Sequence, residues 1–267
     1  MELKELCRET EIIARKTAGF IMKESQHFDI DKAEIKGLND FVSYVDLGAE
    51  EMLAENLGRL IPGAGFFAEE GTITKEGTRY CWIVDPLDGT TNFIHGLHPF
   101  SISIALREYD ETVAGLVYEA GGRESFTAWK NGGAWLNGEK IRVSGAINLS
   151  DSLIATGFPY KDFARLPVYL KCFEYLLKNT HGVRRMGSAS IDLAYVACGR
   201  FDGFFEYGLN LWDVAAGTLL IREAGGKVSD FSGDEIAVTG KEIVAANNMI
   251  YPEFLEIVSK FMLHMIQ

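Results

Sequence analysis

Two carboxylates, Asp85 and Asp88, follow an apolar run in the stretch WIVDPLDGTTNF (residues 82–93). A short apolar run bounded by turn residues indicates a buried strand, and the chain end after it can present both acids and a backbone carbonyl to one point. Hard divalent ions prefer such oxygen ligands, and Mg²⁺ is commonly held by a few carboxylates together with water and substrate phosphate. The following GTT turn (residues 89–91) offers N–H groups that would bind a phosphate if a helix begins there. The stretch therefore predicts metal ligands beside a phosphate-binding turn.

A purely structural role for these aspartates is the alternative, because Asp-Gly pairs often cap turns and helices. Two further acidic segments bear on the choice. FFAEEG places Glu69 and Glu70 after another apolar segment, and LWDVAAG places Asp213 at the start of an expected helix. Each segment alone could be a solvated acid or an N-cap. Together they supply the carboxylates that a site with two or three metal ions needs.

The elements that must position these acids are a mixture of helices and strands. Helical spacing of apolar residues predicts a first helix near the N-terminus, and a second helix is expected after Asp46, closed by Pro62 and Gly63. From Tyr80 onward, short β-branched and aromatic segments separated by turn signals predict a sheet, with a two-residue hairpin turn at 137–138. Later helices are expected over 189–199, 213–226 and 252–266, and later strands over 203–208, 227–231 and 242–248.

This order of elements favours an α+β fold with layered helices and sheets. A dinucleotide-binding fold is not expected, because no GxGxxG lies between an early strand and a helix. The chain shows no repeat, low-complexity tract or linker. We therefore expect a single domain over residues 1–267, with possible subdomains at about 1–145 and 146–267.

Composition narrows the classes of function. The chain has 267 residues and a formal net charge of −12, so a broad basic surface for nucleic acid is not expected. The four cysteines have no CxxC spacing, which argues against a zinc site or a disulfide framework and suits a reducing cytoplasm. The N-terminus lacks the apolar core of a signal peptide, and no apolar stretch approaches the roughly 20 residues of a membrane helix. A cytoplasmic enzyme without membrane partners is the expectation.

Other residues that could do chemistry have plainer roles in this interpretation. Ser188 and Ser190, in GSAS, are expected to be helix caps and packing residues rather than nucleophiles. His95 and His98 lack the spacing of a metal-binding pair and are expected in the pocket wall or at the surface. The arginine pair at 184–185 is assigned to an interface salt bridge.

In order along nearly the whole chain, KGLNDFVSYVD, AEEG, WIVDPLDGTTNF, GSAS, FFEYGLNLWDVAAG and REAGG resemble the motifs of the inositol monophosphatase family. This is a family of metal-dependent, lithium-sensitive phosphatases. The long DPLDGTTNF and WDVAAG motifs together are highly specific. The resemblance implies a five-layer αβαβα sandwich of the inositol monophosphatase and fructose bisphosphatase type, a homodimer, and two to three Mg²⁺ ions in each active site.

The resemblance also assigns metal ligands. Glu69, Asp85 and the backbone carbonyl of Leu87 would hold the first Mg²⁺. Asp85, Asp88 and Asp213 would hold the second. Glu69 would help to bind a third, largely hydrated ion. These assignments make the site a hydrolytic metal centre in which the metals activate water, neutralise the phosphate charge and stabilise the departing alkoxide, without a covalent enzyme intermediate.

Further roles follow from the same motif positions. Thr90, with Glu69, would orient the attacking water, and the N–H groups of Gly89 and Thr90 would hold the phosphate. Asp46 aligns with an acid that supports the water network, and Lys36 with a lysine near the metal loop. The phosphatase reaction implied by the family would then be a direct attack of water on phosphorus.

The residues expected to bind the alcohol part of the substrate lie in the second half of the chain. Glu206 matches the position that hydrogen-bonds substrate hydroxyls, and a carboxylate suits a neutral polyol. Gly187, Ser188 and Ala189 match a segment that lines the same pocket. A strand-end salt bridge is the structural alternative for Glu206.

The predicted activity is Mg²⁺-dependent hydrolysis of a small polyol phosphate, with inositol 1-phosphate as the leading substrate because GTTNF follows DPLD. Tyr160 and Lys161, in a loop where relatives build specificity, could favour a second anionic group, so fructose 1,6-bisphosphate and nucleotide phosphates stay open. A hypothesis of another class is a regulatory protein that binds a partner on the phosphatase fold. The sequence keeps the site residues Glu69, Asp85, Asp88, Thr90 and Asp213, which disfavours a pseudoenzyme but does not exclude a second role.

Overall fold

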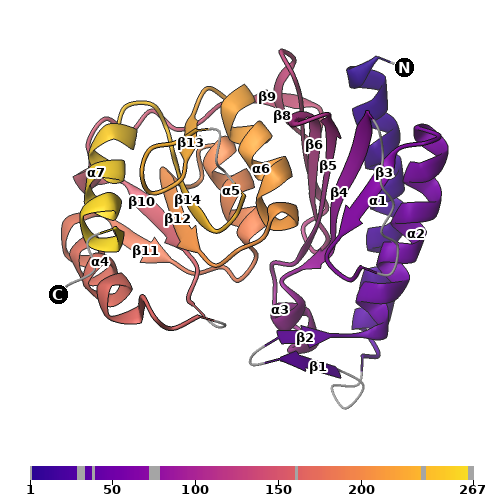
Figure 1. Ribbon diagram of the computed structural model, residues 1–267, viewed down its shortest axis with the longest axis horizontal. Helices are drawn as coiled ribbons and strands as arrows, with labels where there is room; N and C mark the ends of the chain where they lie inside the picture. Colours follow the sequence, from indigo (N-terminus) through magenta and orange to yellow (C-terminus); the bar gives the residue numbers. More distant parts are fainter. Residues whose placement is uncertain are drawn as a thin grey trace.

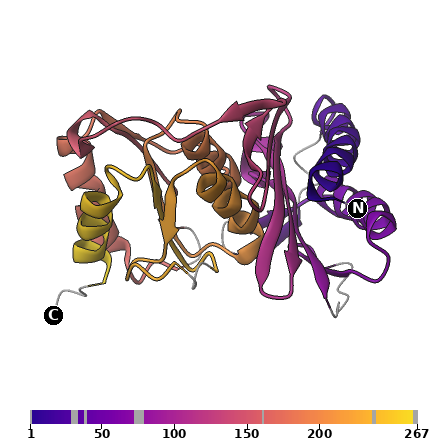
Figure 2. The same ribbon diagram turned by 90° about the horizontal axis from the view of Figure 1, so that it is seen from above.

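The computed structural model describes residues 2–28, 34–37, 40–71, 79–159, 162–235 and 239–263, with the backbone alone for 34–37 and 40–42. Figures 1 and 2 show alternating layers of helices, a sheet, helices, a second sheet and helices. The layered αβαβα sandwich expected from the sequence is thereby confirmed. Within the described ranges, no helix is both long enough and apolar enough to cross a membrane.

Two long helices, α1 (Leu3–Ser25) and α2 (Tyr44–Leu60), form the outer layer beside the larger sheet. They pack against each other and against β4 and β6. The expected start of the second helix after Asp46 is wrong. The helix begins at Tyr44, because Ser43 forms a capping box with Asp46, so that Asp46 lies in the first turn.

The larger sheet has seven strands in the order β3-β4-β5-β6-β7-β8-β9. β3 pairs with β4 in parallel, and every later pair is antiparallel. The β8–β9 hairpin turns at Asn137 and Gly138, which have φ of 51° and 85°, as the predicted two-residue turn requires. The strands are β3 (Gly65–Ala68), β4 (Tyr80–Asp88), β5 (Ser101–Glu108), β6 (Glu111–Glu119), β7 (Glu124–Trp129), β8 (Gly133–Leu136) and β9 (Glu139–Ile141).

The middle layer consists of α5 (Ala189–Ala197) and α6 (Leu211–Glu223), which lie between the two sheets (Figure 2). Residues 213–221 of α6 are all buried, since this helix has packed elements on every side. The two helices approach each other closely at Gly217, where a Cβ would lie 2.5 Å from the Cβ of Leu193. The glycine of WDVAAG therefore allows α6, which carries Asp213, to pack against α5.

The smaller sheet has five strands in the order β11-β10-β12-β14-β13, and α4 and α7 cover its outer face. The later strands and the C-terminal helix expected from the sequence are confirmed, whereas α4 was not predicted. These elements are α4 (Leu166–Asn179), α7 (Tyr251–Met262), β10 (Leu153–Thr156), β11 (Gly182–Arg184), β12 (Gly203–Tyr207), β13 (Lys227–Ser229) and β14 (Glu242–Ala246). The remaining elements are the hairpin β1 (Glu34–Gly37) and β2 (Asp40–Val42), the short helix α3 (Thr90–Ile94) and a 3-10 turn over Leu149–Asp151.

Candidate active site

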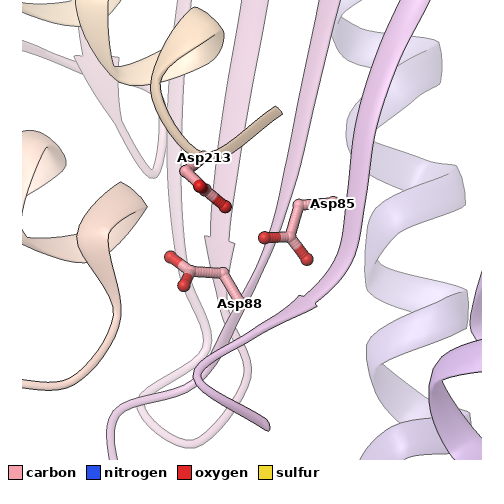
Figure 3. Close-up of side chains that lie close together, drawn as sticks. All are labelled: Asp85, Asp88 and Asp213. Atoms are coloured by element: carbon pink, nitrogen blue, oxygen red, sulfur yellow. The ribbon is translucent and has the colours of Figure 1, made fainter. Parts of the chain in front are cut away.

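Three carboxylates from distant parts of the sequence meet at the end of the larger sheet. Asp85 and Asp88 come from the last residues of β4, and Asp213 comes from the first turn of α6. Each contributes an oxygen, and these three oxygens lie within 4.8 Å of one another. Figure 3 shows the three side chains pointing toward a common centre. We call this group the acidic triad.

A β-bulge at the end of β4 allows its two aspartates to share this centre. Residues three apart on a regular strand point to opposite faces of the sheet. Here Asp85 pairs with Ser103 and Asp88 pairs with Ser101, so that three steps on β4 face two on β5. The Leu87 N–H within the bulge donates to Oδ1 of Asp85 at 2.9 Å, which orients that carboxylate.

Backbone and hydroxyl groups hold the other two members of the triad. Asp213 accepts the N–H of Asn210 at 2.6 Å as part of the capping box of α6. Oδ2 of Asp88 accepts both the hydroxyl of Ser188 and the N–H of Ser190, each at 2.7 Å. The expectation that Ser188 caps its helix is therefore wrong. Ser188 occupies the N-cap position of α5, but its hydroxyl oxygen accepts no N–H of that helix, and its proton is donated to Asp88.

The electrostatics of the triad favour a bound cation. Burial raises the pKa of Asp85 well above its usual value, and the nearby charges of Glu69, Asp88 and Asp213 raise it further. Burial also raises the pKa of Asp88, while the hydrogen bonds from Ser190 and Ser188 oppose this shift. A divalent cation would compensate several acids gathered in a buried centre, and carboxylate oxygens are its preferred ligands. The residues present thus fit a Mg²⁺ site.

Glu69 lies beside the triad at the end of β3. Its N–H donates to the carbonyl of Val84 at 3.2 Å, which continues the parallel pairing of β3 with β4. The next residue, Glu70, donates its N–H to the carboxylate of Glu50 at 2.9 Å. Glu50 is fully buried on α2 and was missed from the sequence, although its position four residues after Asp46 places both acids on one helix face. Glu50 thus anchors the turn that presents Glu69.

The partly exposed Thr90 and the buried Asp46 form a hydrogen-bonded pair next to the triad. The Thr90 hydroxyl lies 3.0 Å from Oδ1 of Asp46 and 3.0 Å from the carbonyl of Leu87. Its single proton can go to only one acceptor at a time, and a carboxylate is the stronger one. Burial raises the pKa of Asp46, whereas hydrogen bonds from Ser43 and Thr90 lower it. Thr90 and Asp46 are therefore in the direct contact that is needed if Asp46 is to orient the hydroxyl of Thr90.

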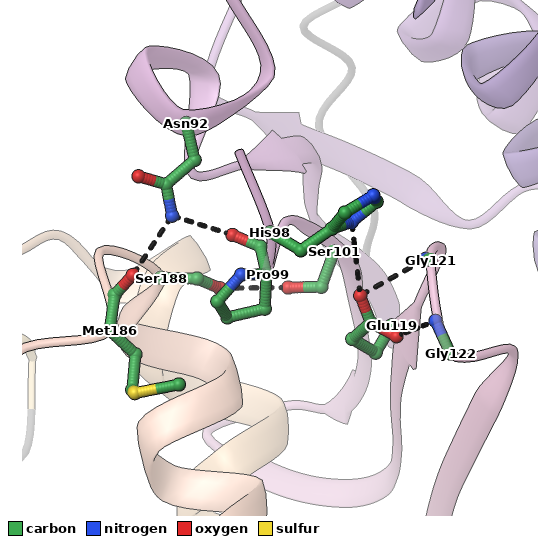
Figure 4. Close-up of polar contacts among 9 residues, drawn as sticks. All are labelled: Asn92, His98, Pro99, Ser101, Glu119, Gly121, Gly122, Met186 and Ser188. Carbon is green, nitrogen blue, oxygen red and sulfur yellow. Dashed lines mark hydrogen bonds and ion pairs between the residues drawn. The ribbon is translucent and has the colours of Figure 1, made fainter. Parts of the chain in front are cut away.

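The conformation of the turn after β4 strongly favours glycine at position 89. Gly89 has φ of +95°, and a Cβ there would lie 3.2 Å from the carbonyl oxygens of Gly187 and Pro99. The N–H groups that begin α3 have no acceptor within the helix. Asn92 secures this turn by donating its amide to the carbonyls of Pro99 (2.7 Å) and Met186 (2.9 Å), as Figure 4 shows. The predicted phosphate-binding turn is thus tied to the segment that precedes α5.

A cavity adjoins the triad on the side of the smaller sheet. Three charged residues, Arg185, Asp192 and Glu206, line this cavity together with residues 187–189. Burial raises the pKa of Glu206 well above its usual value, and the guanidinium of Arg185 opposes this shift. Arg185 lies in the cavity wall with its guanidinium 5.6 Å from the ring centroid of Phe158, and the interface salt bridge expected for the arginine pair stays a prediction. The sequence could not predict that Arg185 lies near Asp192 and Glu206, because these acids belong to other elements, α5 and β12.

The remaining sequence-predicted residues divide into two groups. His98 is at the surface, where its ring stacks on Phe100 and its Nδ1 lies 3.8 Å from the carboxylate of Glu119 (Figure 4), and His95 is also exposed. Three predicted side chains lie outside the part of the chain whose side chains the structure describes: Lys36, Tyr160 and Lys161.

Comparison with known proteins agrees with this architecture. The sequence profile of the Inositol monophosphatase family matches residues 3–262. The chain therefore belongs to the inositol monophosphatase family, whose members are phosphatases and are generally metal-dependent.

Individual relatives carry two kinds of name. The inositol-1-monophosphatase of Mesorhizobium japonicum is 44% identical over 230 residues, which cover 86% of each chain. The Nus factor SuhB of Pseudomonas aeruginosa is 42% identical over 247 residues, which cover 91% of each chain. Among solved structures, the extragenic suppressor protein suhB of Bartonella henselae matches with a TM-score of 0.88 and 38% identity, over 93% of this chain and 96% of the other.

Proposed function

We propose that this protein is a Mg²⁺-dependent phosphomonoesterase that hydrolyses a small polyol phosphate, with myo-inositol 1-phosphate as the leading substrate. The observation that carries the proposal is the acidic triad beside the Thr90–Asp46 pair. Family membership supports the phosphatase reaction, and a relative named inositol-1-monophosphatase at 44% identity supports the substrate.

The metal ligands in this proposal are the five groups expected from the sequence: Glu69, Asp85, the carbonyl of Leu87, Asp88 and Asp213. When bound, two to three Mg²⁺ ions would acidify water and neutralise charge on the phosphate. The chain contributes preorganisation. Hydrogen bonds from Leu87, Ser188 and Asn210 hold the three triad carboxylates in place before any ligand arrives.

Thr90 orients the attacking water in the proposed mechanism. With its proton donated to Asp46, the hydroxyl oxygen keeps lone pairs that can accept a hydrogen bond from water. Glu69 would accept the second proton of that water. The buried Asp46 is itself held by the N–H and hydroxyl of Ser43, at 2.8 and 2.5 Å, so the direction of the Thr90 lone pairs is fixed.

The phosphate group would bind to the N–H groups of Gly89 and Thr90 at the turn after β4. The alcohol part would then enter the cavity lined by Gly187, Ser188, Ala189 and Glu206. A buried carboxylate in that wall suits hydroxyl donors, which supports a polyol. Fructose 1,6-bisphosphate and nucleotide phosphates remain the alternative esters, since the side chains of Tyr160 and Lys161 are outside the described part.

The direct test is phosphate release from inositol 1-phosphate by the purified protein while Mg²⁺ is raised from zero, with Asp88→Asn beside it. We expect Mg²⁺-dependent release from the wild type and its loss in the variant. No release from the folded wild type would redirect the assay to the bisphosphate and nucleotide esters. An Asp88→Asn protein with full Mg²⁺-dependent activity would contradict the metal assignment.

A second candidate function comes from relatives that are named Nus factor SuhB. Their name, at 42 to 43% identity, favours a partner-binding role in addition to catalysis, even though the net charge of −12 gives no broad attraction for nucleic acid. Catalytically dead Asp88→Asn protein separates the two functions, because a partner-binding role would survive in it.

The proposal further includes a homodimer and lithium sensitivity, which family membership supports, and a cytoplasmic location, which the cysteine pattern supports. We also infer a single domain with two subdomains that divide near residue 145. The two sheets support this division, since the larger one is built from residues before 145 and the smaller one from residues after it. The shared middle layer of α5 and α6 supports their folding as one unit.

A further inference from the structure

The cavity beside the acidic triad contains two buried carboxyl groups that receive no hydrogen bond from the described residues. Glu206, on β12, is 5% exposed, and Asp192, on α5, is 1% exposed. Both face the same cavity. Burial and neighbouring charges act on each of them, but no hydroxyl or N–H does. One oxygen of Asp192 is enclosed without any partner in the described chain.

Such groups require an explanation, because buried polar atoms in folded proteins are nearly always hydrogen-bonded. Positive charge is already present, since the guanidinium of Arg185 lowers the pKa of both acids. The part of the chain that the structure describes gives the two carboxyl groups no hydrogen-bond donors. Neutral hydroxyls of a ligand in the cavity would supply them without adding a second cation next to Arg185.

The fold places both acids at the cavity. A Cβ at Gly157 would lie 1.8 Å from Oε1 of Glu206, so this carboxylate lies directly against the glycine backbone and cannot turn that way. Asp192 lies one helical turn after Ser188, whose hydroxyl holds Asp88 of the triad. Helix α5 therefore fixes the position of Asp192 relative to the reacting phosphate.

We propose that Asp192 is a second acceptor for substrate hydroxyls, beside Glu206, and that the pair selects phosphate esters of polyols over esters whose alcohol carries no further hydroxyl. The inference rests on the proposed phosphatase function. It adds Asp192, on α5, to Glu206, on β12, as a residue that determines substrate specificity. Two acceptors on different elements recognise a pattern of at least two hydroxyls, which a single carboxylate cannot do.

The test compares Asp192→Leu and Asp192→Asn with the wild type on two esters, inositol 1-phosphate and p-nitrophenyl phosphate, at saturating Mg²⁺. We expect Asp192→Leu to raise KM for inositol 1-phosphate by about tenfold, as for loss of one good hydrogen bond to a carboxylate. Asp192→Asn keeps one acceptor oxygen and should show a smaller rise. For p-nitrophenyl phosphate, kcat/KM should stay within about twofold, because its alcohol offers no hydroxyl to either acid.

Thermal unfolding distinguishes recognition from a structural role. Since no described group donates to Asp192, Asp192→Leu should melt no lower than the wild type. Thr218→Val is the matched control, because Thr218 on α6 also has a buried oxygen without a partner in the described chain but lines a different cavity. It should resemble Asp192→Leu in stability and leave both KM values unchanged.

Three results would overturn the inference: an unchanged KM for inositol 1-phosphate in Asp192→Leu, an equal loss on both esters, or a large drop in melting temperature. These results leave the proposed function standing if the wild type remains active. A folded wild type that releases phosphate from neither ester would refute the proposed function itself and this inference with it.

Discussion

Replacing Asp88 by asparagine is expected to change the metal-free and the Mg²⁺-loaded protein in opposite directions. The substitution removes one negative charge at nearly constant volume. An amide oxygen at this position can still accept the hydrogen bonds that Ser188 and Ser190 now give to the aspartate. The local fold should persist, so the electrostatic change dominates.

The size of the effect follows from the geometry of the triad. Its ligand oxygens lie within 4.8 Å of one another. At an effective dielectric constant of about 20, two unit charges at that distance repel by about 3.5 kcal/mol. A proton on Asp85, whose pKa burial and its neighbours raise, already relieves part of this repulsion without metal. We expect the free energy of unfolding of the metal-free variant to rise by about 1–3 kcal/mol, equivalent to about 2–5 °C in Tm.

Thermal unfolding in EDTA and in increasing Mg²⁺, with phosphate release measured in parallel, tests both directions. Mg²⁺ should raise the Tm of the wild type, because it binds the native state. In Asp88→Asn this rise should shrink, and turnover should fall by about 10²-fold or more. Asp110→Asn removes the same charge from an exposed turn and serves as the control. A variant that is less stable without metal and responds fully to Mg²⁺ would refute the reasoning.

Three further predictions follow from the same contacts. Because burial raises the pKa of Asp85 well above the usual value of an aspartate, the metal-free protein binds more protons folded than unfolded. Its Tm in EDTA should therefore fall as pH rises above the usual aspartate pKa, and a rising Tm would contradict the assignment. Glu206→Gln should raise KM for inositol 1-phosphate while leaving the Mg²⁺ concentration for half-maximal activity unchanged, and an equal loss on every ester would show that Glu206 does not bind substrate hydroxyls. Gly217→Ala should lower the free energy of unfolding by about 1–3 kcal/mol, because its Cβ would collide with Leu193 on α5. Gly58→Ala, on α2 with open space around it, should instead raise it by about 0.5–1 kcal/mol, and denaturant unfolding of the pair checks both signs.

Sequence reasoning worked best where the signal was local. Each of the motifs after Tyr80 combines a strand or helix period with its own turn residues, so the hairpin at 137–138 and the helix ended by Gly225 were predictable. The predicted start of α2 was wrong. Asp46 was taken as the residue before the helix, whereas it lies in the first turn and forms a capping box with Ser43. Sequence reasoning also missed α4, whose apolar and charged residues were not recognised as a helix.

The sequence by itself determined that two acids and a glycine turn follow a buried strand, since these residues are neighbours along the chain and their types set their chemistry. Only the tertiary structure decided which distant groups complete the site. The bulge that brings Asp85 and Asp88 to one side depends on the pairing of β4 with β5. The position of Asp213 next to them depends on the packing of α6 between the two sheets. The same packing places Asp192 and Glu206 in the wall of one cavity, where no donor from the described ranges reaches one oxygen of Asp192. No local pattern encodes this relation between a helix and a strand, because burial arises only when separate elements come together.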